Sequence, residues 1–392
     1  MNLDYIFSPQ AVRDSAQKVF DYTHNDQGLF QIDMSKLTSC IDFVMKTIEE
    51  NYPQGEIPFH SRFGHFRAGK IERLSWLEEK MQASSSLEKA RILWDLVIPS
   101  VLLDAGAGAS WKFFEKKTQT YFSRSEGLGV ASFHMFLEGV FSQDGKSLKT
   151  QSDALQKMTP QMIEEFFQVT QDNPLIGVEG RVHLLKNLGT VLENTFYFKE
   201  NRPGNLIDYL IAKNSHGLSA QDILRAILDA LGPIWPGRET LENVNLGDVW
   251  RHSKLGLIAF HKLSQWMTYS LIEPLITAGI EVTGVEKLTG LPEYRNGGLF
   301  LDTEVLQFKN RADKSKIYGP ESDLIIEWRA LTVYLLDIVG KEVQKRLHKT
   351  PQEFPLAKVL EGGTWLAGRK IAAQKRVGGT PPLNIKSDGT VF

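Results

Sequence analysis

Apolar residues recur at helical spacing through most of this chain, and this pattern limits the possible folds more than any other feature. The longest run spans residues 323–347, where apolar positions recur about every 3.6 residues. The members of this stripe are Ile326, Ala330, Val333, Leu336, Val343 and Leu347. A stripe of this length predicts a long helix that buries one face against the core.

Further helices are predicted where such stripes follow a capping residue. The segments are residues 36–50, 87–101, 161–170, 220–231 and 261–276. The Ser84–Ser86 run, Thr159 and Ser219 are suitable helix caps because their hydroxyls can accept hydrogen bonds from the first backbone N–H groups. Pro274 is expected to interrupt the last of these helices, since proline lacks the N–H that an internal helical turn needs.

Signals for β-strands are few. Three short candidates occur, at residues 279–284, 298–302 and 382–386. No fixed-period repeat or low-complexity linker divides the chain. The sequence therefore predicts a mostly α protein, with one large helical domain over residues 1–392 and a few short strands.

Composition narrows the functional classes. Hydrophobic residues make up 42% of the chain and charged residues 23%, with a formal net charge of −2. This balance gives no field that would favour nucleic acid or an anionic membrane as a partner. Cys40 is the only cysteine, and no apolar run approaches the roughly 20 residues needed to span a bilayer. We expect a cytoplasmic protein; its oligomeric state stays open.

The segment Glu293–Gly298, with Asp302 shortly after it, carries the strongest chemical signal. It places two carboxylates on either side of Arg295 and a Gly pair. Cleavage of a glycosidic bond uses one carboxylate to activate water or stabilise an oxocarbenium-like centre, while an acid assists the leaving group. A structural ion pair between Arg295 and Glu293 explains the same pattern equally well.

Other segments suggest anion binding. Asp104 precedes a Gly-rich turn that either ends a helix or presents backbone N–H groups to an anion. The segment containing Arg124, Ser125 and Glu126 can bind phosphate or form an internal ion pair. A basic cluster around His60 and Arg62 is either a ligand site or a solvated loop, and Arg369 is either an anion ligand or a surface charge. The candidate anion-binding residues are therefore His60–Arg62, Asp104, Arg124–Glu126 and Arg369.

A predicted helix carries His261, Gln265, Trp266 and Tyr269. His261 and Gln265 share a face through their i, i+4 spacing. Trp266 and Tyr269 can stack on a planar ligand, although a Trp in a helix is more often part of the core.

The motifs of several enzyme classes are missing from the sequence. There is no H-E-x-x-H pair, calcium loop, Walker lysine or G-x-S-x-G nucleophile elbow. We therefore expect neither a metal nor a cofactor. An amidohydrolase would usually need metal ligands, and a phosphoribosyltransferase would need carboxylates for Mg²⁺ after a strand.

Long motifs along the chain resemble one fungal and bacterial family, which is named for the fourth protein of the uracil catabolism (URC) pathway. The similar segments are 58–62, 100–108, 124–128, 260–266, 288–298, 327–332, 360–365 and 387–392. The resemblance implies a pathway in which uracil is ribosylated and its ring is then opened to a ribosylurea. It implies an N-ribohydrolase that releases urea from ribosylurea or its 5′-phosphate. A non-catalytic binding or scaffold protein of the pathway is the alternative.

The resemblance also suggests roles for the candidates above. Glu293, Asp302 and Asp104 are the candidate catalytic carboxylates. Candidate substrate-binding residues, which supply cations for a phosphate and aromatic rings for the sugar or ureido face, are His60, Arg62, Arg124, Ser125, Glu126, His261, Gln265, Trp266, Tyr269, Tyr294, Arg295, Trp365 and Arg369. The segment Glu293–Arg295 also resembles the D-Y-R segment of the queuosine-nucleotide N-glycosylase family, which implies a helical architecture related to DNA glycosylases.

Overall fold

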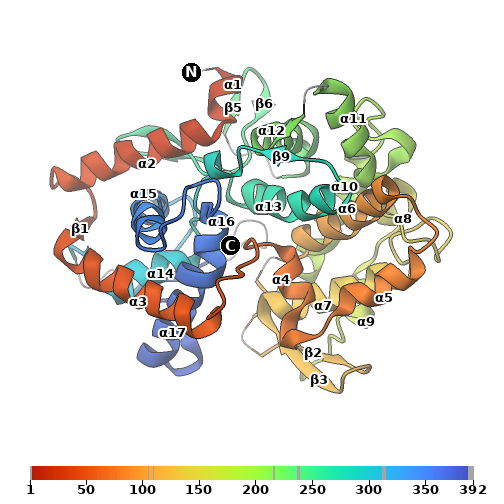
Figure 1. The fold of residues 1–392 in the computed structure, drawn as a ribbon, viewed down its shortest axis with the longest axis horizontal. Helices are drawn as coiled ribbons and strands as arrows, with labels where there is room; N and C mark the ends of the chain where they lie inside the picture. The colour runs from red at the N-terminus through yellow and green to blue at the C-terminus, as the bar shows by residue number, and fades with distance from the viewer. Residues whose placement is uncertain are drawn as a thin grey trace. The chain divides into compact units, whose positions relative to one another are not determined.

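The computed structural model describes residues 2–104, 106–108, 110–214, 217–235, 239–310 and 315–386. These residues group into two compact units. Unit 1 comprises residues 2–60, 239–265 and 284–386, and unit 2 comprises residues 61–235 and 266–283, within the described ranges. Most of the chain is helical (Figure 1), which confirms the predicted mostly α class. A compact unit need not fold alone, so the single-domain organisation stays a prediction.

Unit 1 is built on the long helix α15, which packs against α2. Its helices are α1 (Leu3–Ile6), α2 (Pro9–His24), η1 (Met34–Lys36), α3 (Leu37–Asn51), η6 (Val285–Lys287), α14 (Tyr294–Asp302), α15 (Asp323–Arg346), α16 (Leu356–Val359), η8 (Leu360–Thr364), α17 (Trp365–Lys375) and η9 (Val377–Gly379). Helix α13 (Lys262–Thr277) contributes its first residues to unit 1 and the rest to unit 2. The bounds of α3 and α15 confirm the two strongest apolar stripes.

The strands of unit 1 are short and form two-stranded pairs. They are β1 (Phe30–Ile32), β5 (Thr240–Leu241), β6 (Val244–Asn245), β7 (Val249–His252), β8 (Gly256–Ala259), β10 (Leu306–Phe308), β11 (Ile317–Tyr318) and β12 (Asn384–Ile385). β1 pairs with β10, β5 with β6 and β7 with β8, all antiparallel. β11 pairs with β12 in parallel, which confirms the predicted strand near residue 384.

Unit 2 surrounds α6, whose middle and C-terminal turns are almost wholly buried. Its helices are α4 (Arg62–Phe66), η2 (Ala68–Lys70), α5 (Arg73–Lys80), α6 (Ser86–Leu102), α7 (Arg124–Leu137), α8 (Ser152–Gln156), α9 (Pro160–Phe166), α10 (Val178–Val191), η3 (Lys199–Asn201), η4 (Pro203–Asn205), α11 (Leu206–Lys213), α12 (Ala220–Leu231) and η5 (Gly232–Ile234). Its strands are β2 (Lys112–Glu115), β3 (Thr120–Ser123), β4 (Leu218–Ser219) and β9 (Val282–Thr283). β2 pairs with β3 antiparallel and β4 with β9 in parallel.

The structure confirms the predicted helix caps. Ser85 Oγ accepts the N–H of Glu88 at 3.2 Å, and Thr159 Oγ1 accepts the N–H of Met162 at 3.3 Å. Ser219 and Asp222 form a reciprocal capping box at the start of α12. Helix α9 ends at Phe166, four residues earlier than the predicted segment. Local capping chemistry therefore fixes the helix starts better than the helix ends.

Two predictions of secondary structure are wrong. Residues 298–302 are not a strand but the last part of α14, and Pro274 lies inside α13 without interrupting it. A Cβ at Gly297 would come within 2.7 Å of the Trp328 ring, and one at Gly298 within 3.2 Å of Pro382, so close packing favours both glycines in this helix. Pro274 is buried, as are its neighbours Ile272 and Leu275, and this packing offsets the missing backbone hydrogen bond.

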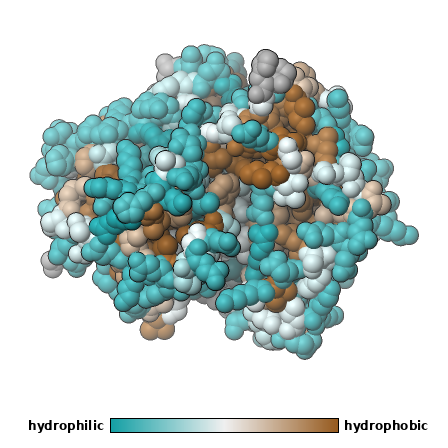
Figure 2. All heavy atoms as spheres, viewed as in Figure 1, coloured by the Kyte–Doolittle hydropathy of each residue, from teal (hydrophilic) through white to brown (hydrophobic). Residues whose placement is uncertain are grey.

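Hydrophilic side chains cover most of the face drawn in Figure 2, with hydrophobic side chains exposed in places. None of the helices in the described part of the chain combines the length and apolar composition needed to cross a membrane.

A buried ion pair in unit 2 joins α5 to the end of β2. The Arg73 guanidinium donates to both carboxylate oxygens of Glu115 at 2.7 Å, and both side chains are fully buried. His134 Nε2 lies 2.7 Å from the same carboxylate, and Thr118 Oγ1 donates to it at 2.6 Å. Burial alone would raise the pKa of Glu115, but these bonds lower it from 4.5 to about 2.

This depressed pKa predicts acid sensitivity. Glu115 contributes stability that is fully present above its unfolded pKa of 4.5 and is lost as the pH falls toward about 2. A difference of this size corresponds to about 3 kcal/mol. Denaturant unfolding at pH 5 and pH 2 should show this loss of unfolding free energy in the wild type. Glu115→Gln should not show it. The other carboxylates titrate in both proteins, so their effects cancel in the comparison. Parallel pH curves for the two proteins would contradict the prediction.

Candidate active site

Glu293 begins the helix α14 of unit 1 as its N-cap. Its Oε2 accepts the backbone N–H of Arg295 at 2.7 Å, and its Oε1 accepts that of Asn296 at 2.5 Å. Burial raises the pKa of Glu293, while the two backbone hydrogen bonds and the charges of Arg295 and His60 oppose that rise. Each carboxylate oxygen retains a further lone pair. Glu293 is thus a carboxylate held by two backbone N–H groups, with a pKa above its usual value.

His60 forms a close pair with Glu361 in the same unit. The Nδ1 atom of His60 lies 2.7 Å from Oε2 of Glu361, and the imidazole is almost fully buried. Tyr52 donates its hydroxyl to the other oxygen of Glu361 at 3.4 Å. The ring of Trp365 lies 5.4 Å from that of His60, centroid to centroid. A carboxylate and an indole therefore lie beside the imidazole of His60, whose charge acts on Glu293.

The backbone around Glu361 is unusual. Residues Leu360–Thr364 form η8, a π-helical turn between α16 and α17. Such turns are rare and occur often at functional sites. A Cβ at Gly362 would come within 2.7 Å of Ile57, and one at Gly363 within 2.8 Å of Val44, so glycine permits the close packing of this turn. The turn directs Glu361 toward His60.

Helix α17 also packs tightly on the start of α14. A Cβ at Gly368 would lie only 2.1 Å from the backbone carbonyl oxygen of Arg295. Thr364 Oγ1 donates to Oδ1 of Asn296 at 2.8 Å, and the side-chain amide of Asn296 donates to Leu291 at 3.0 Å. The position of Glu293 thus depends on the contact between α14 and α17.

This contact predicts a large effect of one methyl group. Gly368→Ala is expected to destabilise the protein by about 1–3 kcal/mol or more, because the obstacle is backbone that cannot rotate away. Gly180→Ala is the matched control: it also lies inside a helix, but a Cβ there meets no atom within 4 Å. Since alanine favours helix more than glycine by about 1 kcal/mol, the control should be neutral or stabilising in denaturant unfolding. Equal effects of the two substitutions would contradict the packing argument.

Tyr294 and Arg295 follow Glu293 directly in α14, and Arg369 lies in α17. The guanidinium of Arg295 donates to the carbonyl of Gly379 at 2.9 Å and lies 4.7 Å from the Tyr294 ring centroid. Arg369 is exposed, and its guanidinium lies 5.7 Å from the Trp365 ring. Arg295 thus ties α14 to η9, whereas Arg369 offers a cation at the surface.

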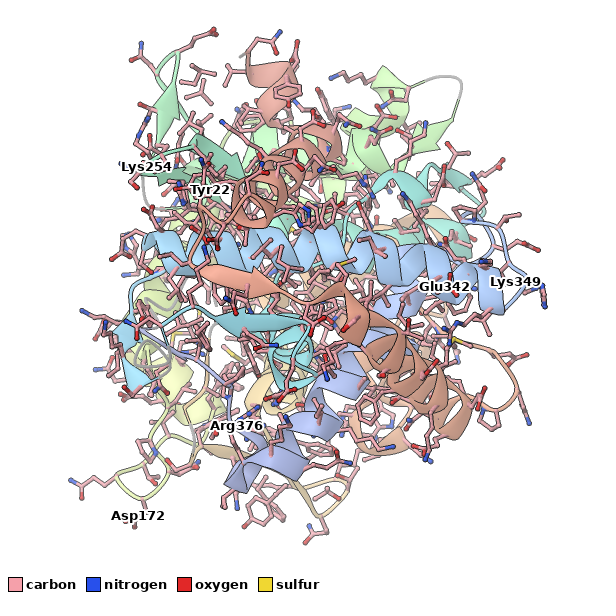
Figure 3. The ribbon with its side chains drawn as sticks, turned by 90° about the vertical axis from the view of Figure 1, so that its left-hand side faces the viewer. Tyr22, Asp172, Lys254, Glu342, Lys349 and Arg376 are labelled. Carbon is pink, nitrogen blue, oxygen red and sulfur yellow. The ribbon has the colours of Figure 1, made fainter. Side chains whose placement is uncertain are left out.

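Asp302 lies at the other end of α14, about 14 Å along the helix axis from Glu293. Both of its oxygens accept from Arg376, at 2.6 and 2.5 Å. Arg376 follows the end of α17 and is labelled in Figure 3. The structure does not bring Asp302 together with Glu293, and its contacts point to a structural ion pair.

His261 and Gln265 are held by structural contacts in unit 1. His261 is fully buried and has a φ of 49°, and its Nε2 donates to the carbonyl of Ile6 at 2.8 Å. Burial lowers the pKa of His261, so the ring is neutral. Gln265 donates to Thr289 Oγ1 at 2.6 Å and accepts the N–H of Thr289 at 2.8 Å. These contacts hold both side chains in place, although the Nδ1 atom of His261 is buried without a hydrogen-bond partner.

A second polar cluster lies in unit 2 around Arg62, which is fully buried. Its guanidinium donates to Asp104 at 2.5 Å and to Ser100 Oγ at 2.7 Å, and it lies 3.0 Å from His65 Nδ1. Burial lowers the pKa of Arg62, and the charge of Asp104 opposes that shift. Burial also lowers the pKa of Arg181 to about 10, so this guanidinium remains charged at neutral pH.

Asp104 lies in the loop that follows α6. Helix α6 ends at Leu102, which confirms that the Gly-rich segment follows a helix end. Arg181 donates to the carbonyls of Leu103 at 3.0 Å and Gly106 at 3.2 Å. Ala105 and Ala109 lie outside the described residues, as does the 387–392 segment of the family motifs. Two buried guanidinium groups thus hold this loop, and Asp104 serves as the counter-charge of Arg62.

The remaining candidates of unit 2 lie near this cluster. Arg124 is the first residue of α7 and has a φ of 54°, which is uncommon for a residue with a side chain. Ser125 accepts from Arg62 through its carbonyl at 3.4 Å, and the charge of Glu126 acts on Arg62. Trp266 lies 5.7 Å from the Arg62 guanidinium, and Tyr269 is fully buried.

Sequence reasoning missed Glu361, Tyr52, Asn296 and Thr364 as members of the unit 1 site. The Gly362–Gly363 pair was the available signal, because adjacent glycines inside a helical segment indicate unusual packing. Within the described ranges, no three His, Cys, Asp or Glu side chains are grouped so that they could hold a metal ion.

Fold and site define a mostly helical protein in which the charge of a carboxylate-paired imidazole acts on a helix-capping carboxylate. The chain matches the model of a family described as a protein of unknown function (DUF1688) over residues 5–392, and it belongs to that family. Uracil catabolism protein 4 of Lachancea kluyveri is 38% identical over 436 residues, covering 100% of this chain and 99% of the relative. Protein urg3 of Schizosaccharomyces pombe is 41% identical over 401 residues, covering 99% of this chain and 98% of the relative. These matches confirm the resemblance inferred from the motifs.

Proposed function

We propose that this protein is an N-ribohydrolase of uracil catabolism, which cleaves the C–N glycosidic bond of ribosylurea or its 5′-phosphate and releases urea. The name of one relative supports the pathway. The observation that carries the reaction is Glu293, a carboxylate fixed by two backbone N–H groups with a pKa raised by burial. A base of raised pKa is suited to take a proton from water near neutral pH.

In this reaction Glu293 takes a proton from a water molecule as the water oxygen bonds to C1′ of the ribose. The C1′–N bond breaks, and its electron pair goes to the ureido nitrogen, which gains a proton to give urea. The negative charge of Glu293 also stabilises the positive charge that develops on the sugar ring. Trp365, half-buried beside His60, supplies an aromatic face for the sugar or the ureido group.

For a phosphorylated substrate, Arg369 is the best-placed cation of this site. Its side chain is exposed beside Trp365, where a ligand can reach it, whereas Arg295 is buried. A charge-assisted hydrogen bond of about 1.5–3 kcal/mol corresponds to an effect on affinity of about 10–100-fold. Arg369→Gln should therefore raise KM for ribosylurea 5′-phosphate and leave KM for ribosylurea almost unchanged.

The test is to follow urea release from both compounds with the wild-type protein, and to measure their binding by calorimetry in parallel. Saturable urea release from either compound is the expected result. Tight binding without urea would support the scaffold alternative in place of the enzyme. Neither binding nor turnover would overturn the proposed function.

A further inference from the structure

We propose that His60 is the general acid that protonates the departing ureido nitrogen, and that Glu361 is its positioning residue. This inference rests on the proposed function and deepens it. The ureido group is a poor leaving group because its nitrogen would otherwise depart as a strongly basic anion, so its departure needs a proton in the transition state. Glu293 accepts a proton from water in the same step, so a second group must donate the proton to the leaving nitrogen.

The contact with Glu361 fixes the proton positions on His60. An ionised carboxylate can only accept hydrogen bonds, so the 2.7 Å contact requires that Nδ1 carries a proton and donates it to Glu361. The opposite ring nitrogen, Nε2, is then the atom that transfers a proton to the substrate.

The surroundings hold the pair in place. The backbone N–H of His60 donates to the carbonyl of Ala357 at 2.9 Å, and the ring lies against Trp365. Burial and the negative charge of Glu361 raise the pKa of Tyr52, so its hydroxyl keeps its proton and donates to Glu361. The side chain of Glu361 is 15% exposed, and the side chain of His60 is 7% exposed. The imidazole of His60 is thus held in one orientation before substrate binds.

The proton inventory of the step balances. The imidazolium of His60 loses its Nε2 proton to the ureido nitrogen as the C1′–N bond breaks, and becomes neutral imidazole. Glu293 gains the proton that water loses as its oxygen bonds to C1′. The products are urea and ribose, or ribose 5-phosphate, and transfer of one proton from Glu293 to His60 through solvent restores the starting state.

The test compares two leaving groups. Ribosylurea needs an acid, whereas a 4-nitrophenyl riboside does not, because nitrophenolate departs without a proton. We expect His60→Gln to lower kcat/KM for ribosylurea by about 10²–10⁴-fold, the usual contribution of general acid catalysis. The same variant should change kcat/KM for the nitrophenyl riboside less than tenfold. Glu293→Gln is the matched control and should lower both, because it acts on water.

Variants of Glu361 test its role as a positioning residue separately. Glu361→Gln should also lower kcat/KM selectively for ribosylurea, but by a smaller factor than His60→Gln. Glu361→Asp should restore part of this kcat/KM. A His60→Gln variant that loses activity equally on both substrates, while its unfolding free energy matches the wild type, would overturn the inference and leave the proposed function standing. A wild-type protein that cleaves neither substrate would overturn the proposed function, and this inference with it.

Discussion

Glu293→Gln is expected to lower kcat for urea release by about 10²–10⁴-fold, equivalent to about 3–5 kcal/mol of transition-state stabilisation. The substitution keeps the shape of the side chain but removes the proton acceptor. KM should change little, because the carboxylate acts mainly on water and on the charge that develops in the transition state. Steady-state kinetics on ribosylurea measure both parameters.

Asp302→Asn is the control for this prediction. Asp302 is the other candidate carboxylate of α14, and its bidentate pair with Arg376 gives it a structural use. This variant should lose stability but retain kcat within a few-fold. Glu293→Gln should itself lose only about 1 kcal/mol of stability, since the amide oxygen can still accept one of the two backbone N–H bonds. Equal losses of kcat in both variants would contradict the assignment of Glu293.

Arg329→Leu is expected to destabilise unit 1 by about 3–5 kcal/mol, the usual cost of removing one partner of a buried ion pair. The guanidinium of Arg329 is 1% exposed and donates to both oxygens of Asp248, at 2.9 and 2.7 Å. Asp248 also accepts from the Trp250 indole at 2.7 Å and from the N–H of Lys262 at 2.9 Å. The pKa of Asp248 stays well below its usual value, because the charge and hydrogen bonds of Arg329 outweigh the effect of burial. The variant would therefore leave a largely buried carboxylate without its cation.

Arg251→Leu provides the matched comparison. Arg251 makes the same kind of bidentate pair with Glu239, at 3.1 and 2.6 Å, but its side chain is 61% exposed. An exposed pair contributes about 0–1 kcal/mol, so this variant should unfold close to the wild type in denaturant. Similar losses from the two arginines would show that burial does not set the strength of these pairs.

Local chemistry explains which helices could be predicted. The stripes of α3 and α15 and the caps at Ser85 and Ser219 act within one or two helical turns, and the structure confirms them. The wrong strand at residues 298–302 has a tertiary cause. Gly297 packs against Trp328 and Gly298 packs against Pro382, both distant in the sequence, and periodicity cannot detect such contacts.

The same limit applies to the site. The residue types of the segment around Glu293 identified a candidate carboxylate, because Glu293 and its backbone donors are adjacent in the chain. The pair formed by His60 and Glu361 joins residues separated by 301 positions, and only the fold brings them together. Asp302 and Asp104 had the right chemistry in the sequence, but each is paired with an arginine in the structure. Residue type alone cannot distinguish a structural carboxylate from a catalytic one.

The most direct test of the central claim is the product balance of a single reaction. Wild-type protein incubated with ribosylurea should release urea and ribose in equal amounts, and Glu293→Gln under the same conditions should release both about 10²–10⁴-fold more slowly. Ammonia and carbon dioxide in place of urea would show that the ureido group is hydrolysed and the glycosidic bond spared. That result would contradict the assignment of this protein as an N-ribohydrolase.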